Sequence, residues 1–532
     1  MSSPMLQSSC REPSRDEQTD PALLRALNAP ATYGRDGPVD VHETHASWVF
    51  VAGEHAYKIK KPVALGFLDY STLSRRHAAC REEVRVNQEL APGIYLGVLA
   101  IVKGEDGFRF APEGSPHAVE YVIQMRSFHE SDTMEAAIVA GALTATELEG
   151  IANCLTAFHH RAPVVSAGGP GEVLESWLVN VEELRSLKYA NRWRVDLASH
   201  FGEAFVHAHS REIQQRGREG QVRDGHGDLR CEHVLLKPQI RVVDRIEFDP
   251  ALRHIDVAAD LAFLIMDIKA HGQTWAAQEL VRAYTHAGGD PGSEALLSFY
   301  AAQRAIVRAK VALLDAAEHE PADRGARYER AEVLWALAER LCWRARQPVA
   351  IVVCGPPASG KSTLAAELAR RSRLPVASSD VVRKSLAGLT PTERACPEYY
   401  SDEFTEVTYL HLAVKALGHL REDGGVIVDA TCHSPEQRKL LLDELKLAGV
   451  TQLVIYCHTT SKVGLQRAAA RMNHPERVSD ATPEIAAKQI YRFQAPLELP
   501  PASVLSLDTE LGLETQVSEV VGAIDKRLAQ RS

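Results

Sequence analysis

The chain lacks the features that mark secreted, disulfide-bonded or membrane-spanning proteins. It has no run of 18 apolar residues and no apolar segment near its N-terminus of the kind that export signals carry. Its nine cysteines form no C-x-x-C pair and are odd in number. Scattered thiols of this kind fit the reducing cytosol better than a disulfide framework or a zinc site. We therefore expect a soluble cytoplasmic protein with no membrane partner.

The chain also lacks an excess of positive charge. Its 60 Lys and Arg stand against 70 Asp and Glu, which gives a net charge of −10. This balance argues against non-specific binding of nucleic acid, although a nucleic-acid end stays open as a substrate. A length of 532 residues indicates two to four domains. Residues 1–38 are predicted to be disordered or poorly ordered, with a short helix considered over residues 21–29.

One stretch, residues 349–364, carries the strongest signal: V-A-I-V-V-C-G-P-P-A-S-G-K-S-T-L. Six apolar residues, Val349 to Cys354, are typical of a buried parallel strand, and helix-forming residues follow the glycine-rich turn. Backbone N–H groups of such a turn surround phosphate oxygens, a lysine neutralises the β- and γ-phosphates and a hydroxyl ligates Mg²⁺. The residues predicted to bind nucleotide are Gly355, Pro356, Pro357, Ala358, Ser359, Gly360, Lys361, Ser362 and Thr363, with Ser362 as the Mg²⁺ ligand.

Five strand candidates, separated by helical runs, predict a doubly wound parallel sheet in the C-terminal part. They are 349–354, 374–378, 425–429, 452–458 and 503–507. Functional groups of such sheets lie at the carboxyl ends of the strands.

Polar residues follow several of these strands. Asp380 is positioned to act as general base toward a hydroxyl acceptor, and Arg383, one turn further, to bind an anionic acceptor group. Asp429 ends the third strand and could act on Mg²⁺ through water. Arg467 and Arg471 are four residues apart, so they share a helix face and suit a lid over the transferred phosphate.

A second set of candidates lies in the N-terminal half. Residues 47–52 and 56–59 predict two strands joined by a hairpin at Gly53 and Glu54. Lys58 lies in the second strand, where kinases of the eukaryotic type place the lysine that contacts the α- and β-phosphates. The helix predicted over residues 73–90 offers Glu82 or Glu83 as its partner, and the sequence leaves this choice open.

The stretch R-D-G-H-G-D-L-R-C-E-H-V-L-L at residues 223–236, followed by I-R-V-V-D at 240–244, suits a kinase catalytic core. Asp228 would accept the proton of a substrate hydroxyl and Asp244 would hold Mg²⁺.

These residues resemble the aminoglycoside phosphotransferase-like kinases, whose catalytic stretch is H-G-D-L-H-x-x-N followed by a strand that ends in I-D. The chain matches at residues 226–229 and at Val243 and Asp244. It departs at Arg230, where the family usually has His, and at His233, where the family has a metal-binding Asn. His is a poorer Mg²⁺ ligand than an amide oxygen. The resemblance implies a protein-kinase-like fold over residues 39–346. A degenerate domain with a binding or scaffolding role is the alternative.

The C-terminal residues resemble the P-loop kinases related to polynucleotide kinase, gluconate kinase and zeta toxin. In that family the first acid activates the acceptor, the following arginine contacts the acceptor and the later arginines form the lid. The order of the two parts resembles bacterial two-domain proteins usually described as AAA family ATPases. The fold class expected is therefore mixed α/β and α+β, a kinase-like fold followed by a P-loop NTPase domain over residues 347–532.

The function expected from this set is ATP- and Mg²⁺-dependent phosphotransfer to a hydroxyl of an unidentified small or nucleotide-like acceptor. The alternative is an ATP-hydrolysing switch whose N-terminal domain binds or scaffolds.

Overall fold

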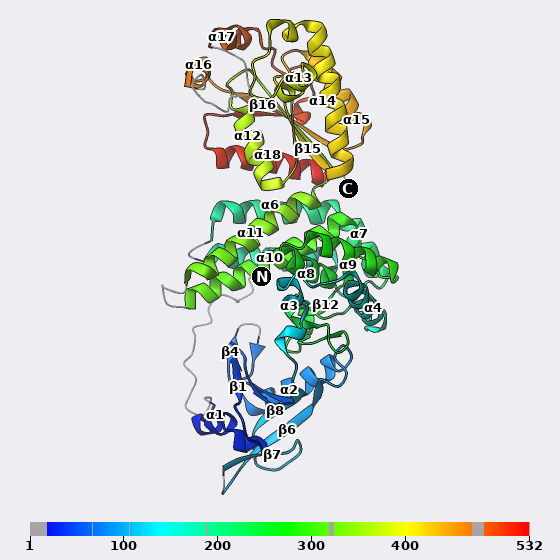
Figure 1. Ribbon diagram of the computed structural model, residues 1–532, viewed down its shortest axis with the longest axis vertical. Coiled ribbons are helices and arrows are strands. Elements are labelled where there is room, and N and C mark those ends of the chain that lie inside the picture. The colour runs from blue at the N-terminus through cyan, green and yellow to red at the C-terminus, as the bar shows by residue number, and fades with distance from the viewer. Residues whose placement is uncertain are drawn as a thin grey trace. The chain divides into compact units, whose positions relative to one another are not determined.

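The computed structural model describes residues 19–65, 68–105, 107–187, 190–318, 324–470 and 483–530. The chain forms two compact units. Their helices and strands are labelled in Figure 1. The first comprises the residues up to Gly168 together with Gln215–Gly292, and the second comprises Gly169–Gln214 and Ser293 onward. Among the described residues, no helix has the length and apolar character needed to span a membrane.

The first unit is built on a six-stranded antiparallel sheet of order β1-β2-β3-β8-β6-β7. The helix α2 (Leu73–Asn87) packs on this sheet through Cys80, which lies in one buried cluster with Ala56, Ile123 and Met125. The strands are β1 (Asp40–Glu43), β2 (Ser47–Ala52), β3 (His55–Lys60), β6 (Tyr95–Gly104), β7 (Gly107–Pro112) and β8 (Ala118–Arg126). The hairpin predicted around Gly53 is therefore confirmed, with Gly53 at a positive φ of 67°.

The start of the chain differs from the expectation of poor order over residues 1–38. Pro21–Leu27 form α1 and Pro30–Tyr33 form the short 3-10 helix η2. Leu23 and Leu27 are buried against Phe50 and Tyr57 of the sheet, and this apolar contact fixes the segment. The expectation of poor order is thus corrected for residues 21–33, and the short helix considered over residues 21–29 is present as α1. Residues 1–18 lie outside the described residues.

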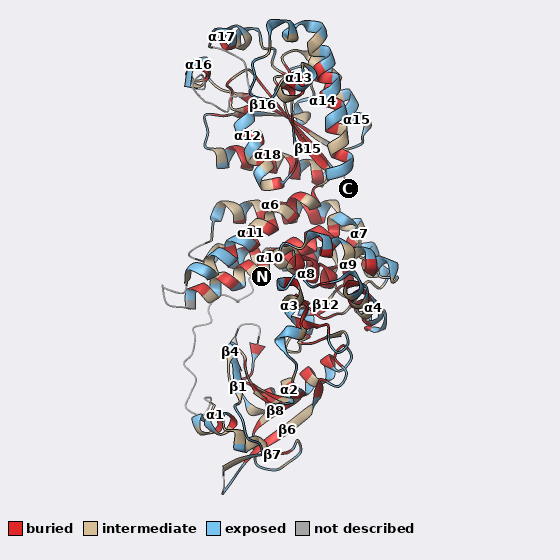
Figure 2. Cartoon of the chain, in the orientation of Figure 1, coloured by how far each residue is buried: buried red, intermediate tan, exposed pale blue. Residues whose placement is uncertain are grey.

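The remainder of the first unit is mainly helical, with short ribbons. β9 pairs with β12 and β10 pairs with β11, each antiparallel. The helix α8 is buried along most of its length (Figure 2). The elements are β4 (Ala64–Leu65), β5 (Leu68–Asp69), η3 (Glu130–Asp132), α3 (Met134–Val139), α4 (Ala145–Arg161), β9 (Val222–Asp224), η4 (Cys231–His233), β10 (Val234–Leu235), β11 (Arg241–Val242), η5 (Pro250–Leu252), β12 (His254–Asp256), α8 (Val257–Ala270) and α9 (Thr274–His286). The helix α7 (Ser210–Arg218) spans the division between the units.

The second unit contains a parallel five-stranded sheet of order β14-β15-β13-β16-β17. Its strands are β13 (Val349–Cys354), β14 (Val376–Ser378), β15 (Gly425–Asp429), β16 (Thr451–His458) and β17 (Val504–Asp508). All five predicted strands are present within a few residues of the expected bounds. The predicted fold class, with a doubly wound parallel sheet after a kinase-like part, is confirmed.

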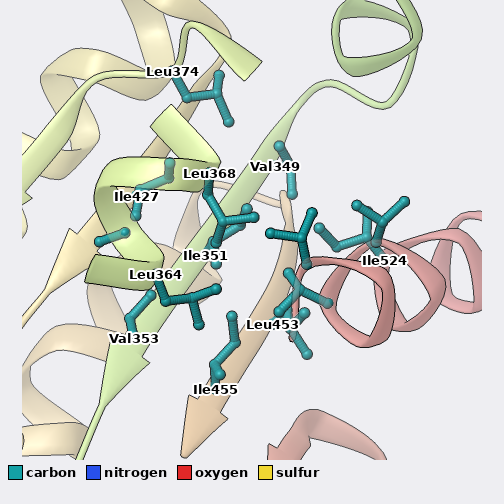
Figure 3. Close-up of a cluster of buried hydrophobic side chains, with 14 of the residues drawn as sticks. Val349, Ile351, Val353, Leu364, Leu368, Leu374, Ile427, Leu453, Ile455 and Ile524 are labelled. Carbon is teal, nitrogen blue, oxygen red and sulfur yellow. The ribbon is translucent and has the colours of Figure 1, made fainter. Parts of the chain in front are cut away.

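Helices cover both faces of this sheet because the side chains of β13 alternate between two cores. Val349, Ile351 and Val353 pack with residues of α12 (Lys361–Ser372) and α18 (Leu513–Ala529) (Figure 3). Ala350 and Val352 pack on the other face with α13 (Ser379–Leu386), α14 (Asp402–Asp423) and α15 (Pro435–Leu447). The short elements of this part are η6 (Pro397–Tyr400), α16 (Ser461–Ala470), α17 (Pro483–Arg492) and η8 (Pro501–Ser503).

Four helices that precede β13 belong to the same compact unit. They are α5 (Pro170–Ser186), α6 (Arg192–Ala208), α10 (Glu294–Glu318) and α11 (Arg324–Ala345). Trp177, Phe205 and Phe299 stack among α5, α6 and α10. α6 packs against α18, and α11 against α12. The domain boundary expected between residues 346 and 347 stays a prediction. The helices α6 and α11, which precede it, pack onto α18 and α12, which follow it.

A buried ion pair closes this packing at the entry to β13. Arg346 Nε donates to Asp525 Oδ1 at 2.6 Å and Nη2 donates to Oδ2 at 2.9 Å. The side chains are 3% and 5% exposed, and the guanidinium carbon lies 4.3 Å from the centre of the Phe201 ring. Each of these buried charges is compensated by the other, so the two depend on each other.

We predict that Asp525→Ala lowers the free energy of unfolding of the second unit by about 3–5 kcal/mol, because an uncompensated buried guanidinium remains. Urea unfolding followed by tryptophan fluorescence measures this change. Glu519→Ala, at a less buried position of the same helix, is the control and should change the stability by less than about 0.5 kcal/mol. Equal effects of the two variants would show that the buried pair does not stabilise the unit.

Candidate functional site

The turn between β13 and α12 has the shape of a phosphate-binding loop. Gly355 and Gly360 have positive φ values of 144° and 93°. A Cβ at Gly355 would lie 2.2 Å from the Cys457 carbonyl oxygen, and one at Gly360 would lie 3.1 Å from Cβ of Thr509. The backbone therefore needs glycine at both positions. The loop ends at the N-terminus of α12, where unpaired N–H groups favour an anion.

Two side chains of the loop support the fit to a phosphate chain. Lys361 is 9% exposed, and its Nζ donates to the Pro356 carbonyl at 2.8 Å, so the ammonium lies across the loop. The Ser359 hydroxyl is fully buried and has no hydrogen-bond partner within the part of the chain that the structure describes. A buried hydroxyl without a partner is costly, and a phosphate oxygen would satisfy it. Ser362 is exposed at the start of α12.

The strand register brings Asp429 and Asp380 to this loop. Asp429 is the last residue of β15 and lies opposite Val353 on one side and Ser378 on the other. Val353 precedes the loop by two residues, and Asp380 follows Ser378 by two residues, in the first turn of α13. Both carboxylates are half-buried. The loop, Asp429 and Asp380 thus lie at one carboxyl edge of the sheet, as expected for a parallel sheet.

Arg383 is held by protein groups in this structure. It is 7% exposed, and its Nη1 donates to the Tyr399 carbonyl at 2.5 Å and to the Thr405 hydroxyl at 3.2 Å. The guanidinium carbon also lies 4.8 Å from the centre of the Tyr400 ring. Arg383 therefore fixes the η6 segment onto α13, and its contact with an acceptor stays a prediction.

Arg467 of α16 lies near the loop through a residue that the sequence does not single out. Its Nη1 and Nη2 donate to the hydroxyl and the carbonyl of Thr509 at 3.0 and 2.8 Å. The Thr509 hydroxyl in turn lies 2.6 Å from the Ser359 carbonyl. Arg467 is thus linked to the phosphate-binding loop by one residue. Arg471, its expected partner in a lid, lies outside the described residues.

The first unit contains a buried cluster of charges of the kind expected for a kinase-like centre. Lys58 Nζ lies 2.8 Å from Glu83 Oε1 and 3.0 Å from Asp244 Oδ1. Lys60 contacts Glu83 and Glu247. Between the two glutamates that the sequence leaves open, Glu83 is therefore the partner of Lys58.

The neighbouring residue, Glu82, faces elsewhere. Its carboxylate pairs with Arg85 and Arg253.

The electrostatics of the cluster keep its members charged. Burial opposes the charged form of Lys58, yet Asp244 and Glu83 hold the pKa of Lys58 well above its ordinary value. Burial likewise opposes ionisation of Glu83, and the ammonium groups of Lys58 and Lys60 keep the pKa of Glu83 below its ordinary value. Lys58 and His233 also lower the pKa of Asp244. The buried charges of Lys60 and Glu83 are stable in the interior because their partners are present, whereas Asp244, with a side chain 45% exposed, lies at the edge of the cluster.

Arg230 restrains the predicted base of this centre. Its Nε donates to both carboxylate oxygens of Asp228, at 3.2 and 3.1 Å. Its Nη2 lies 3.0 Å from Nε2 of His233, while Nδ1 of His233 donates to the Asp228 carbonyl at 2.8 Å. A carboxylate bound to a guanidinium is a weaker base. The lone pair of the His233 ring nitrogen that accepts from Arg230 cannot bind a metal ion at the same time. The two departures from the family pattern therefore act together.

The structure also identifies supporting residues that the sequence pattern did not reveal. Asp260 accepts from the backbone N–H groups of His226 and Gly227 at 2.6 and 3.0 Å, and it pairs with His159 at 3.2 Å. His226 donates from Nε2 to the Val243 carbonyl, and burial lowers its pKa to about 4, so it is neutral. His159 is 1% exposed. Its burial could not be read from helical spacing alone.

Comparisons with known proteins place the chain in a family. Residues 351–496 match a family model described as an AAA domain. A Mycobacterium tuberculosis protein and a Mycobacterium bovis protein, both named only as uncharacterized, are each 32% identical over 463 residues, which is 84% of this chain and 89% of theirs. The chain belongs to the family of these mycobacterial proteins. The match to the family covers both units.

Three solved structures are similar to parts of the chain. A gluconokinase from Sinorhizobium meliloti 1021 is 19% identical, with a TM-score of 0.26, over 35% of this chain and 95% of that one. A choline/ethanolamine kinase family protein from Mesorhizobium loti is 15% identical, with a TM-score of 0.37, over 60% and 97%. An APS kinase from Mycobacterium tuberculosis, in complex with AMPPNP and APS, is 19% identical, with a TM-score of 0.25, over 33% and 97%.

We predict that Glu83→Gln lowers the free energy of unfolding of the first unit by about 3–5 kcal/mol, because Lys58 and Lys60 lose a buried counter-charge. Glu82→Gln, one residue away, should change it by about 1 kcal/mol or less, since its pairs are more exposed. Thermal unfolding monitored by circular dichroism compares the two variants with the wild type. A larger loss for Glu82→Gln would contradict the assignment of Glu83.

Proposed function

We propose that the chain is an ATP-dependent phosphotransferase that transfers the γ-phosphoryl group to a hydroxyl at the site in its second unit. The observation that carries this proposal is the meeting of the glycine-built loop, Asp429 and Asp380 at one edge of the parallel sheet. Lys361, the buried Ser359 hydroxyl and the N-terminus of α12 suit the phosphate chain of a nucleotide. The carboxylate of Asp380 follows β14, which lies one strand further from the loop than the strand of Asp429. It has no evident role in binding the nucleotide and suits a general base.

The chemistry assigned to each residue is simple. Asp380 accepts the proton of the acceptor hydroxyl as the oxygen of that hydroxyl forms its bond to the γ-phosphorus. The bond from that phosphorus to the bridging oxygen breaks, and ADP leaves. Lys361 and Arg467 stabilise the negative charge of the transferred group. The hydroxyl of Ser362 and the carboxylate of Asp429 are oxygen donors that fit Mg²⁺, which would neutralise the β- and γ-phosphates when bound.

We predict that Asp380→Asn lowers phosphate transfer by roughly 10²–10⁴-fold and leaves ATP affinity unchanged, because the amide keeps its size and loses its basicity. The acceptor is first identified by screening ATP consumption over sugars, nucleosides and RNA 5′ ends. Transfer to that acceptor and calorimetric ATP affinity are then measured in the same variant of the full-length chain. The full chain is required because α6 and α11 pack on α18 and α12.

Two matched variants complete this experiment. Asp402→Asn, in the first turn of α14 and exposed, should leave both quantities unchanged. Lys361→Ala should lose most of the ATP affinity of this site, whereas Lys462→Ala on the exposed part of α16 should not. Wild-type transfer by Asp380→Asn would exclude Asp380 as the base. Hydrolysis of ATP that no acceptor stimulates would favour the switch.

The contacts of the first unit support a second, narrower proposal. The arrangement of Lys58, Glu83 and Asp244 suits binding of a nucleotide, whereas Arg230 holds the group that would act as base. We therefore assign the first unit a nucleotide-binding role without efficient transfer, consistent with the regulatory alternative.

In a Lys361→Ala background, we predict that the full chain retains one weak nucleotide site that requires Mg²⁺ or Mn²⁺. Asp244→Ala in this background should abolish that binding, because the metal ion that would bridge to the phosphates loses its carboxylate ligand. Asp36→Ala, at an exposed position of the same unit, is the control. Calorimetry with each metal gives the result, and binding that persists in Asp244→Ala would remove the first unit from nucleotide recognition.

A further inference from the structure

A group of potential metal ligands lies in the first unit beside the Asp228 loop. Cys231, Asp267 and His271 place one ligand atom each within 4.8 Å of the others. Cys231 begins η4, Asp267 is in the last turn of α8, and His271 directly follows that helix. A fourth group, the Glu135 carboxylate at the start of α3, lies 3.2 Å from Nε2 of His271. The thiol, the imidazole and the Asp267 carboxylate thus lie together, and a second carboxylate, Glu135 of a third segment, lies beside the imidazole.

The hydrogen bonds of His271 fix which of its nitrogens carries a lone pair. Nδ1 lies 2.9 Å from the carbonyl oxygen of Asp267, and a carbonyl can only accept, so Nδ1 holds a proton. In the neutral ring the lone pair is then on Nε2, which faces the carboxylate oxygen of Glu135 at 3.2 Å. Two lone pairs at this distance repel each other. The contact is stable only if a second proton or a metal cation lies between them.

Cys231 is held toward the same point. Its side chain is fully buried, and its backbone N–H donates to Asp267 Oδ2 at 2.8 Å. Burial and the nearby Asp267 carboxylate raise the pKa of the thiol well above its ordinary value. A metal that takes the place of the thiol proton would remove this cost, since it binds the thiolate directly.

We propose that Cys231, His271 and Asp267, with Glu135 as the fourth ligand, bind a single Zn²⁺ ion. Thiolate, imidazole and carboxylate are the ligand types that zinc takes in tetrahedral sites, whereas Mg²⁺ and Ca²⁺ prefer oxygen alone. Binding breaks the S–H bond of Cys231 and forms the Zn–S bond, and the ion also takes the place of the proton between His271 and Glu135, so two protons are released to solvent. The carbonyl of Asp267 orients His271 in the way that outer groups orient ligands in zinc sites.

The sequence did not suggest this site because the ligands have no zinc-motif spacing. Only Asp267 and His271, four residues apart at a helix end, lie near each other in the chain. The bound ion would tie η4 to α8 and α3, three residues beyond Asp228. Its effect would fall on the position of the Asp228 loop, and it is independent of the phosphotransfer proposed for the second unit.

The experiment uses the full-length chain without a histidine tag, stripped with a chelator and dialysed against Zn²⁺. We expect one zinc per chain by elemental analysis, with about two protons released per zinc in a weakly buffered titration. Cys231→Ser and His271→Ala should each weaken zinc binding by at least about 100-fold, because even outer-shell changes cost roughly 10–100-fold. Cys154→Ser and the exposed His286→Ala are matched controls that should bind as the wild type does.

Cobalt keeps the test decisive if a variant fails to fold. Co²⁺ bound to the wild-type chain should show a thiolate-to-metal charge-transfer band in the near ultraviolet and visible bands of tetrahedral cobalt. Wild-type chain without these bands, or zinc bound below one equivalent, would overturn the proposal and leave His271 and Glu135 as an ion pair. A folded Cys231→Ser variant that binds zinc as tightly as the wild type would overturn it as well.

Discussion

The second unit depends on burial of one strand on both faces. All six residues of β13 are buried, and neighbouring residues point into different cores. A strand of this kind must lie in the interior of a parallel sheet with helices on both sides. Parallel pairing with β15 and β16 then brings the carboxyl ends of the strands together. The position of the glycine loop and of Asp429 follows from hydrophobic burial.

The first unit depends instead on mutual compensation of buried charges. Lys58, Lys60 and Glu83 come from a strand and a helix, and Asp244 and Glu247 come from the chain beyond β11. Removing such groups from water is expensive, and only close pairing offsets the cost. The cluster therefore fixes β3, α2 and the Asp244 segment against each other. Tyr95 adds to this by accepting from the backbone N–H of Asp244 at 3.1 Å.

Much of the fold could be predicted because its signals are local. Six consecutive apolar residues predict β13, and a glycine-rich turn between strand and helix predicts the loop that follows it. Side-chain partners were harder to predict because they depend on tertiary contacts. Glu82 and Glu83 are adjacent and similar in sequence, yet rotation along α2 buries one and leaves the other at the edge. Thr509 lies far along the chain from Ser359, and only the fold joins the two through a hydrogen bond. Arg383 illustrates a further limit, since its spacing from Asp380 predicts an acceptor contact, whereas what covers its side chain is the η6 segment.

The two candidate sites differ in how easily a single substitution can remove their proposed function without disturbing the fold. The loop in the second unit would bind a phosphate chain through backbone geometry, and a side chain at Gly355 would collide with a neighbouring strand, so change there disturbs the fold. In the first unit, Glu83 is fully buried and contributes to stability, whereas Asp228 lies at the edge, where Arg230 can bind it without disturbing the core. The need to fold therefore favours retention of the lysine–glutamate pair even where Arg230 binds the predicted base, Asp228. A kinase-like fold with an intact pair and a restrained base is the state expected from that asymmetry.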